Sequence, residues 1–301
     1  MKKLLFFISI LFLTLGGFAQ ANKSAQDYIN SATLNIRKQN YQAALQDLDK
    51  VIEIDPTNSY AYYQQGFIYD ELEQYKSALE KFNKVVELTP DDPTAYFNRG
   101  VIEDKLNMYQ ESAEDFTKGI ELDPYDAKAY MYLSNVQFHL NQKQEVIDNL
   151  NKAMKLDPKN ADIYYYRGVA YGAIGDLDNA ILDLTEAIKL QPNNAINYFA
   201  RAFGYAENGK YEQAIADYTK GLKINPNDAN AYESRGLAKQ KLGREKEARE
   251  DFQKAYFIRQ EVNKDYLTRS SSGNTTLYIT LVLAGIIILI IVVPFVIKRH
   301  L

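Results

Sequence analysis

Hydrophobic and polar positions along the chain follow the period of an amphipathic helix, and the whole pattern recurs every 34 residues. Six prolines mark the period: Pro56, Pro90, Pro124, Pro158, Pro192 and Pro226. Within each interval, apolar and small residues are spaced by four and by seven, which places them on one face of a helix. The pattern predicts two helices per interval, for example over 59–72 and 75–88, and an all-α chain.

When the intervals are aligned on the 34-residue period, equivalent positions carry similar residues, and we call each such set of positions a column. Two columns belong to the first helix of each interval and two to the second. The first helix carries a Tyr column (Tyr28, Tyr62, Tyr96, Tyr130, Tyr164, Tyr198 and Tyr232) and, four residues on, a small column (Ala32, Gly66, Gly100, Ser134, Gly168, Ala202 and Gly236). In the second helix a small residue precedes a large one by four, as in Ala44 and Leu48, Ala78 and Phe82, Ala180 and Leu184, Ala214 and Tyr218, and Ala248 and Phe252. Small residues let the two helices approach closely.

The ends of the helices are also encoded. Each recurring Pro lacks an N–H and disfavours helix in the residue before it, so it stops one helix. Two residues later comes a residue whose side chain can cap the next helix: Asn58, Asp92, Asp126, Asn160, Asn194 or Asp228, with Ser24 at the matching place before the first interval. Each interval is therefore predicted to be a pair of antiparallel helices.

The period and the columns resemble the tetratricopeptide repeat. Tyr62, Gly66, Tyr69, Ala78, Phe82 and Pro90 match its pattern, as do Tyr164, Gly168, Tyr171, Ala180, Leu184 and Pro192. The resemblance implies a right-handed α-solenoid (superhelix) of seven helix-turn-helix repeats within residues 20–262, at 25–58, 59–92, 93–126, 127–160, 161–194, 195–228 and 229–262. Ser134, Lys143 and Val146 depart from the pattern, so looser packing is expected in the fourth repeat. Gln260 replaces the last Pro, and the final helix is expected to run through Val262 toward Leu267.

Both ends of the chain differ from the middle. Residues 1–19 have the charged start, short apolar run and small-residue exit of a signal peptide, and an uncleaved anchor is the alternative. After a helix extension and linker at 263–276, residues 277–297 contain no charge and are long enough for a transmembrane helix, and 298–301 would form a cytoplasmic tail. These features predict a single-pass membrane protein whose repeats lie outside the cytoplasm, facing the periplasm from a bacterial inner membrane.

Composition excludes several classes of function. The segment 20–276 contains all 39 Asp and Glu residues but only 31 of the 35 Lys and Arg residues, so its net charge is −8. A negative net charge disfavours binding to nucleic acid. The chain has no Cys and only two His, one of them His139. No Gly-rich phosphate loop or catalytic Ser-His-Asp set is present. We therefore expect no metal, no cofactor and no enzymatic activity.

One column departs from the family pattern. Arg occupies it in four repeats, and in each case an Asp follows sixteen residues later, forming the pairs Arg99 and Asp115, Arg167 and Asp183, Arg201 and Asp217, and Arg235 and Asp251. We expect a two-pronged ion pair between the two helices of these repeats. A catalytic role is disfavoured because the same pair recurs in four repeats.

The resemblance also implies a binding surface, since the first helix of each repeat lines a concave groove in this family. Aromatic residues at the corresponding positions are Tyr63, Phe67, Phe97, Tyr132, Phe138, Tyr165, Tyr166, Phe199 and Phe203. The alternative is that several of them pack against a neighbouring helix. The expected function is a membrane-anchored, non-enzymatic scaffold that binds protein or peptide partners in this groove. A sensor or accessory ectodomain of an envelope signalling or assembly complex is the second reading, and a glycan-acting protein or enzyme the third.

Overall fold

The structure, a computed structural model, describes residues 23–270, and their side chains as far as Glu261. These residues form two compact units, divided between Lys159 and Asn160. Both units are entirely helical in the part of the chain described. The division coincides with the end of the fourth 34-residue interval.

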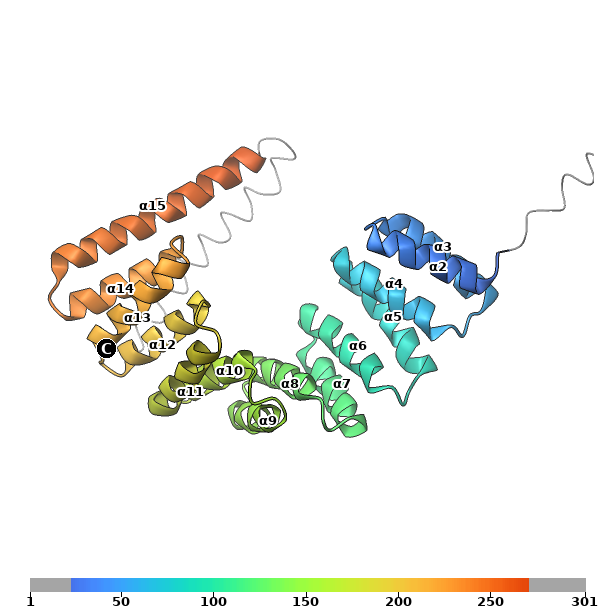
Figure 1. Cartoon of the computed structure of the whole chain (residues 1–301), viewed down its shortest axis with the longest axis horizontal. Coiled ribbons are helices and arrows are strands. Elements are labelled where there is room, and N and C mark those ends of the chain that lie inside the picture. Colours follow the sequence, from blue (N-terminus) through green and yellow to red (C-terminus); the bar gives the residue numbers. More distant parts are fainter. Residues whose placement is uncertain (1–22, 271–301) are drawn as a thin grey trace, which may run out of the picture. The chain divides into compact units, whose positions relative to one another are not determined.

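Unit 1 contains four antiparallel helix pairs (Figure 1). Its helices are α2 (Ala25–Arg37), α3 (Tyr41–Ile54), α4 (Ser59–Glu71), α5 (Tyr75–Leu88), α6 (Pro93–Lys105), α7 (Tyr109–Leu122), α8 (Ala127–His139) and α9 (Lys143–Leu156). The two helices of a pair pack closely, and the second helix of one pair also contacts the first helix of the next. We call the first helix of each pair the A helix and the second the B helix.

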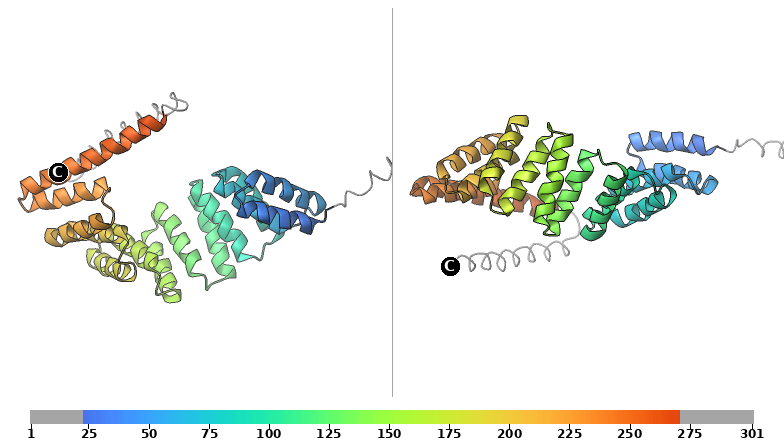
Figure 2. Two further views of the ribbon diagram at one scale, coloured as in Figure 1. Left: turned by 45° about the horizontal axis from the view of Figure 1, so that its top comes forward. Right: turned by 90° about the horizontal axis from the view of Figure 1, so that it is seen from below.

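Unit 2 repeats this arrangement in three pairs, which the two further views display from other directions (Figure 2). Its helices are α10 (Ala161–Ala173), α11 (Leu177–Leu190), α12 (Ala195–Glu207), α13 (Tyr211–Ile224), α14 (Ala229–Lys241) and α15 (Glu245–Ser270). Thirteen-residue A helices alternate with fourteen-residue B helices until α15, which has 26 residues. The last B helix thus continues past Val262, as the missing Pro predicts.

The predicted caps begin all seven A helices. The side chains of Ser24, Asn58, Asp92, Asp126, Asn160, Asn194 and Asp228 each accept a hydrogen bond from a backbone N–H in the first turn. Pro93 occupies the start of α6, where the missing N–H has no helical partner to lose. Among the six B helices of 14 residues, only α11 has such a cap, from Asp176.

The turn inside each pair contains one residue with positive φ. In unit 1 this residue has a side chain, namely Gln39, Glu73, Asn107 or Asn141, with φ of 57 to 60°. In unit 2 it is Gly175, Gly209 or Gly243. An L-residue with a Cβ is strained in this left-handed region, whereas Gly is not, so the two units differ in how easily they form the same turn.

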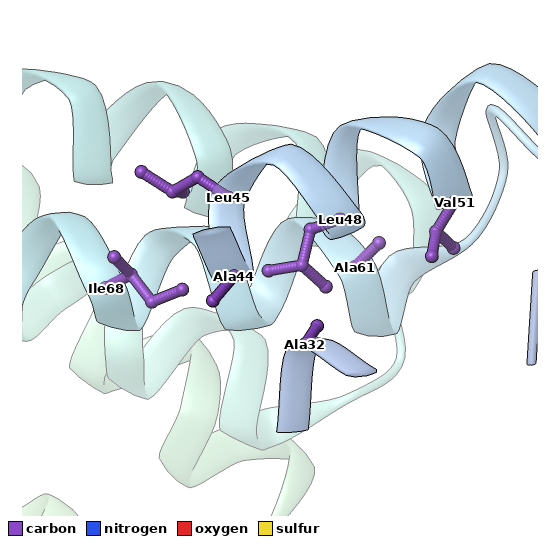
Figure 3. Packing of buried hydrophobic residues seen from close by; sticks show 7 residues of the cluster. All are labelled: Ala32, Ala44, Leu45, Leu48, Val51, Ala61 and Ile68. Atoms are coloured by element: carbon purple, nitrogen blue, oxygen red, sulfur yellow. The ribbon is translucent and has the colours of Figure 1, made fainter. Parts of the chain in front are cut away.

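The core is assembled from the small and large columns at the contact between helices. In the first repeats it contains Ala32, Ala44, Leu45, Leu48, Val51, Ala61 and Ile68, with Leu48 extending toward Ala32 and Ala61 (Figure 3). The small column is required for this approach: a Cβ on Gly66 would lie 2.8 Å from the Phe82 ring. In the fourth repeat, Ser134 and Val146 are fully buried, so the looser packing expected there is not seen at these positions.

The predicted membrane localisation is wrong on the evidence of the structure. Between residues 23 and 270, no helix is both long enough and apolar enough to cross a bilayer. Only α15 has the length, and Glu, Lys, Arg or Asp residues recur in its turns. The predicted signal peptide 1–19 and transmembrane helix 277–297 lie outside the described residues.

Candidate functional site

All nine aromatic residues predicted to line a groove lie on A helices, five in unit 1 and four in unit 2, and we call the exposed side of the A helices within each unit its A-helix face. Three of the residues directly after the Tyr column, Tyr63, Phe97 and Phe199, lie against the B helix of their own repeat. Their rings meet core rings at centroid distances of 5.9 Å for Tyr63 and Phe82, 5.6 Å for Phe97 and Phe116, and 6.4 Å for Phe199 and Tyr218. Tyr165 is half-buried beside Tyr166, and burial raises its pKa. The side chains of these four residues therefore mainly pack within the protein and leave only part of their surface for a partner.

Other predicted residues project from the A helices. Phe67 is 37% exposed, Phe138 42%, Tyr166 40% and Phe203 58%. Tyr132 lies between the two groups: it is half-buried, and its ring is 5.1 Å from that of Phe97. Large exposed apolar side chains on one face of a monomer are a feature of interaction surfaces.

In unit 1, polar contacts between neighbouring A helices occupy part of the A-helix face. Asn98 Nδ2 donates to the Tyr63 hydroxyl at 3.0 Å, and Lys105 forms an ion pair with Asp70 of the preceding repeat. The ammonium of Lys128 lies 5.2 Å from the centre of the Phe97 ring. Burial also raises the pKa of the Tyr63 hydroxyl, and the hydrogen bond from Asn98 opposes this rise. Much of the face in unit 1 is thus occupied by contacts within the chain.

In unit 2, the same face opens into an apolar pocket of about 350 Å³. The pocket lies among α10, α11 and α12. Its lining includes Val169, Gly172, Leu177, Leu184, Ala200 and Phe203, and every other lining residue is Gly or Ala. A cavity of this size with an apolar lining can receive a large apolar side chain.

The pocket exists because two positions near the end of α10 carry small residues. A Cβ built on Gly172 would meet no atom within 4 Å, so this Gly borders open space and is not needed for close packing. Ala173 follows it in a column where every other repeat has a charged residue or His: Arg37, Glu71, Lys105, His139, Glu207 and Lys241. The sequence contained this signal, but the absence of a large side chain is harder to notice than an aromatic residue.

The four Arg and Asp pairs predicted from the sequence each lie between the A and B helices of one repeat. In every pair the Arg Nε and Nη2 atoms donate to the two carboxylate oxygens of Asp at 2.6 to 2.9 Å. The Asp residues are buried, and the guanidinium groups are largely so. The hydrogen bond from Arg99 to Asp115 raises the pKa of Arg99, so this cation is held in the charged form.

A second link from the Arg column was not predicted. The Nη1 atom of Arg99 donates to Asn83, that of Arg201 to Thr185, and that of Arg235 to Thr219, at 3.0 to 3.2 Å. Each acceptor lies sixteen residues before the Arg, on the B helix of the preceding repeat. Gln65, which takes the place of Arg in the second repeat, bonds Asp49 in the same backward direction. The column therefore joins repeats as well as the helices within them.

Two Arg and Asp pairs have an additional ionisable neighbour, four residues after the Arg. In unit 1 this is Glu103, which is buried; burial raises its pKa to about 8, and the Asp115 carboxylate adds to the rise. In unit 2 it is Lys239, whose Nζ lies 2.9 Å from an oxygen of Asp251. The position four residues after the Arg thus holds an acidic residue, Glu103, in unit 1 and a basic residue, Lys239, in unit 2.

The four buried Asp carboxylates are engaged by these pairs, and neither they nor Glu103 line the apolar pocket of unit 2. Within residues 23–261 no group of three or more His, Asp or Glu side chains is arranged to hold a metal ion. The single His of the repeats, His139, stacks on Tyr109 with ring centroids 4.5 Å apart. The A-helix face is consequently the candidate functional site of the described chain.

Solved structures with the same architecture include a tetratricopeptide repeat protein from Parabacteroides merdae, which is 20% identical. The match covers 81% of this chain and 97% of that one, with a TM-score of 0.64. MamA protein is 27% identical over 57% of this chain and 94% of its own, with a TM-score of 0.53. YrrB, described as a TPR protein with an unusual peptide-binding site, is 22% identical over 61% and 95%, with a TM-score of 0.52. The comparison with curated proteins found no match.

Family models agree with the structural matches. Models described as TPR repeat match residues 66–103, 135–175 and 204–243, and models described as tetratricopeptide repeat match 28–58, 48–80, 93–126, 161–194 and 229–260. Together they cover well over half of the chain, and their spacing is that of the helix pairs in both units. The chain therefore belongs to the tetratricopeptide repeat family.

Proposed function

We propose that the chain is a non-enzymatic scaffold that binds a linear segment of a protein partner along its A-helix face. The observation that carries the proposal is the exposure of Phe67, Phe138, Tyr166 and Phe203 on A helices. Aromatic side chains provide a large contact area at a small cost in conformational entropy, and they are enriched among the residues that dominate binding energy. Tetratricopeptide repeat proteins serve as protein interaction scaffolds, which agrees with this reading.

The chemistry of the buried groups supports binding over catalysis. Asp115, Asp183, Asp217 and Asp251 are each held by two hydrogen bonds from Arg, so their lone pairs are directed into the helix interface. A general acid or base must instead reach a proton of the substrate. The repeated pairs account for these residues as structural elements.

Selection of displayed random peptides against the full chain tests the proposal. We expect the selected peptides to lose at least tenfold in affinity for Phe67→Asp or Phe203→Asp, because each change places a charge on the binding face. Leu182→Asp is the matched control, since Leu182 is 66% exposed but lies on the B helix α11. Peptides that bind both variants as well as the unaltered chain, or the absence of any selected peptide, would refute the proposal.

A further inference from the structure

We propose that the pocket among α10, α11 and α12 is an anchor site for one large apolar side chain, Phe or Leu, of a peptide with Lys or Arg next to that anchor. This inference rests on the proposed function and gives it a location and a sequence preference. It places the strongest contact of the A-helix face in unit 2.

The lining determines that the guest is a side chain and not a free small molecule. Val169, Leu177, Leu184 and Phe203 present only carbon atoms to the cavity, and the remaining lining residues are Gly or Ala. Sites that hold a free ligand combine an apolar wall with a few polar groups that fix its orientation. Here no side chain of the lining supplies one, so the orientation must come from a peptide backbone held outside the pocket.

The charges around the pocket determine which residues can flank the anchor. Glu207 lies on α12 one turn after Phe203, at the i+4 position, and is exposed. Asp178 follows Leu177 on α11, and its side chain is 84% exposed, whereas the Asp176 side chain caps α11 by accepting from the backbone N–H of Asn179. Lys210 lies 3.8 Å from Asp178, and Asn208 Nδ2 donates to the same carboxylate at 3.2 Å, so Glu207 is the main acidic group beside the pocket. The C-terminal end of α10 borders the pocket at Gly172 and the N-terminal end of α11 borders it at Leu177, so the partial charges of these two helix ends oppose each other.

Exposed carboxylates such as Glu207 and Asp178, on helices that line an apolar pocket, complement a cationic residue next to an apolar one. A peptide with Glu or Asp at the flanking positions would meet like charge, which is the usual means by which charges exclude the wrong partner. The ammonium or guanidinium stays at the solvated rim while the apolar side chain enters. The preference for a basic flank should therefore weaken as salt concentration rises.

Gly172 provides a substitution that separates binding from folding. Its Cβ position is open, so Gly172→Leu directs a side chain into the cavity without a clash with the backbone. Replacing Gly at a position outside the left-handed region also reduces the conformational entropy of the unfolded chain, which favours folding. The variant should therefore fold at least as stably as the unaltered chain while its pocket is filled from within. Gly168, by contrast, is required by packing, since a Cβ there would lie 2.8 Å from Leu184.

Methyl NMR titration of the full chain with three synthetic peptides tests the inference. Each peptide has seven residues, with blocked ends and Gly and Ser outside the central three. The first has Phe flanked by Lys, the second has Phe flanked by Glu, and the third has Ala flanked by Lys. We expect the first to cause saturable shifts of the Val169, Leu177 and Leu184 methyl signals. The second should bind at least tenfold more weakly, and the third should leave these signals unchanged.

The Gly172→Leu variant completes the test. It should abolish the response to the first peptide while its thermal unfolding temperature stays equal or rises. Equal binding by the variant, equal binding of the Glu-flanked peptide, or no response to any of the three peptides would overturn the anchor site. Shifts confined to unit 1, for example at Val101 on α6, would overturn it too but would leave the proposed function standing. If the peptide selection described above fails, both the proposed function and the anchor site are refuted.

Discussion

Units 1 and 2 place different side chains at equivalent positions of the A-helix face. In unit 1, Asp70 and Lys105 occupy the end of neighbouring A helices and bond to each other across repeats. In unit 2, Gly172 and Ala173 occupy the corresponding end of α10, and a pocket forms. The repeats of the two units have the same backbone arrangement. Side chains at positions outside the family pattern therefore decide whether the A-helix face is covered by contacts within the chain, as in unit 1, or contains a pocket, as in unit 2.

The same contrast appears in the Arg column. All three repeats of unit 2 carry Arg there, at Arg167, Arg201 and Arg235, whereas unit 1 has one Arg among Ser31, Gln65, Arg99 and Leu133. Unit 2 therefore depends on charged pairs that are largely desolvated. Removing one partner of such a pair leaves a charge without compensation.

The largest expected effect comes from breaking a pair in unit 2. Arg201→Met should lower the free energy of unfolding by about 3 kcal/mol, because the buried carboxylate of Asp217 and the hydroxyl of Thr185 both lose their donor. Urea unfolding followed by circular dichroism measures the change. Lys189→Ala is the control: it removes an exposed ion pair with Glu186 and should cost less than about 0.5 kcal/mol.

The equivalent substitution in unit 1 should have little effect. Gln65 is buried and, within the described chain, its Oε1 atom has no hydrogen-bond partner, while its partner Asp49 is exposed and can be hydrated. Gln65→Leu should therefore change the free energy of unfolding by less than about 1 kcal/mol. If Gln65→Leu lowered the free energy of unfolding as much as Arg201→Met, the Arg column would contribute equally to stability in both units.

The next effect is a pH dependence that separates the units. In the folded chain the pKa of Glu103 rises from 4.5 to about 8, so the folded state retains a proton that the unfolded chain releases. Its contribution to stability is complete below pH 4.5 and is lost as the pH rises through about 8. Between pH 5 and pH 8 the free energy of unfolding should fall by an amount on the order of 2 kcal/mol. Glu103→Gln should remove most of this slope in urea titrations, and an unchanged slope would contradict the assignment.

In unit 2 the corresponding cluster should respond to acid instead. Burial raises the pKa of Asp251, but hydrogen bonds from Arg235 and Lys239 outweigh burial and lower it overall. A lowered carboxyl pKa stabilises the fold above the unfolded value of 3.8, and the contribution is lost as the pH falls through the folded pKa. Lys239→Met should therefore reduce stability at neutral pH and make the loss in acid smaller.

The smallest effect concerns the turns between paired helices. Glu73 adopts φ of 57° where unit 2 has Gly, so Glu73→Gly should raise the free energy of unfolding by about 0.5 to 1 kcal/mol. The reciprocal change Gly209→Ala, at φ of 71°, should lower it by about 1 kcal/mol. Thermal unfolding of the two variants checks the signs, and a gain for Gly209→Ala would exclude strain at this position as the cause.

The features that repeat could be predicted from the sequence. Pro56 and its equivalents predicted the helix ends, the residues two positions later cap six of the seven A helices described, and Ser24 caps the first. The spacing of sixteen between Arg and Asp predicted pairs that the structure places in contact. Each of these signals occurs several times at a fixed period, which makes it visible without an alignment. Local rules for helix ends act through the backbone and depend little on context.

Features carried by one position were missed. The pocket depends on Gly172 and Ala173 lacking side chains, and the raised pKa of Glu103 depends on burial that no spacing reveals. The backward bond from Arg201 to Thr185 required the helix of the preceding repeat to be placed first. The localisation was wrong because it rested on the two ends of the chain, whereas the helices that the structure describes are amphipathic and pack against each other.

The Arg column also has a consequence for how unit 2 opens. Thr185 on α11 is bonded to Arg201 on α12, which is bonded to Asp217 on α13; Thr219 on the same helix is bonded to Arg235 on α14, which is bonded to Asp251 on α15. Detaching one hairpin therefore breaks a hydrogen bond from a guanidinium to a Thr hydroxyl as well as the apolar packing against the next hairpin, which ties the opening of neighbouring hairpins together. Amide hydrogens from α12 to α14 should consequently exchange with solvent as one cooperative block.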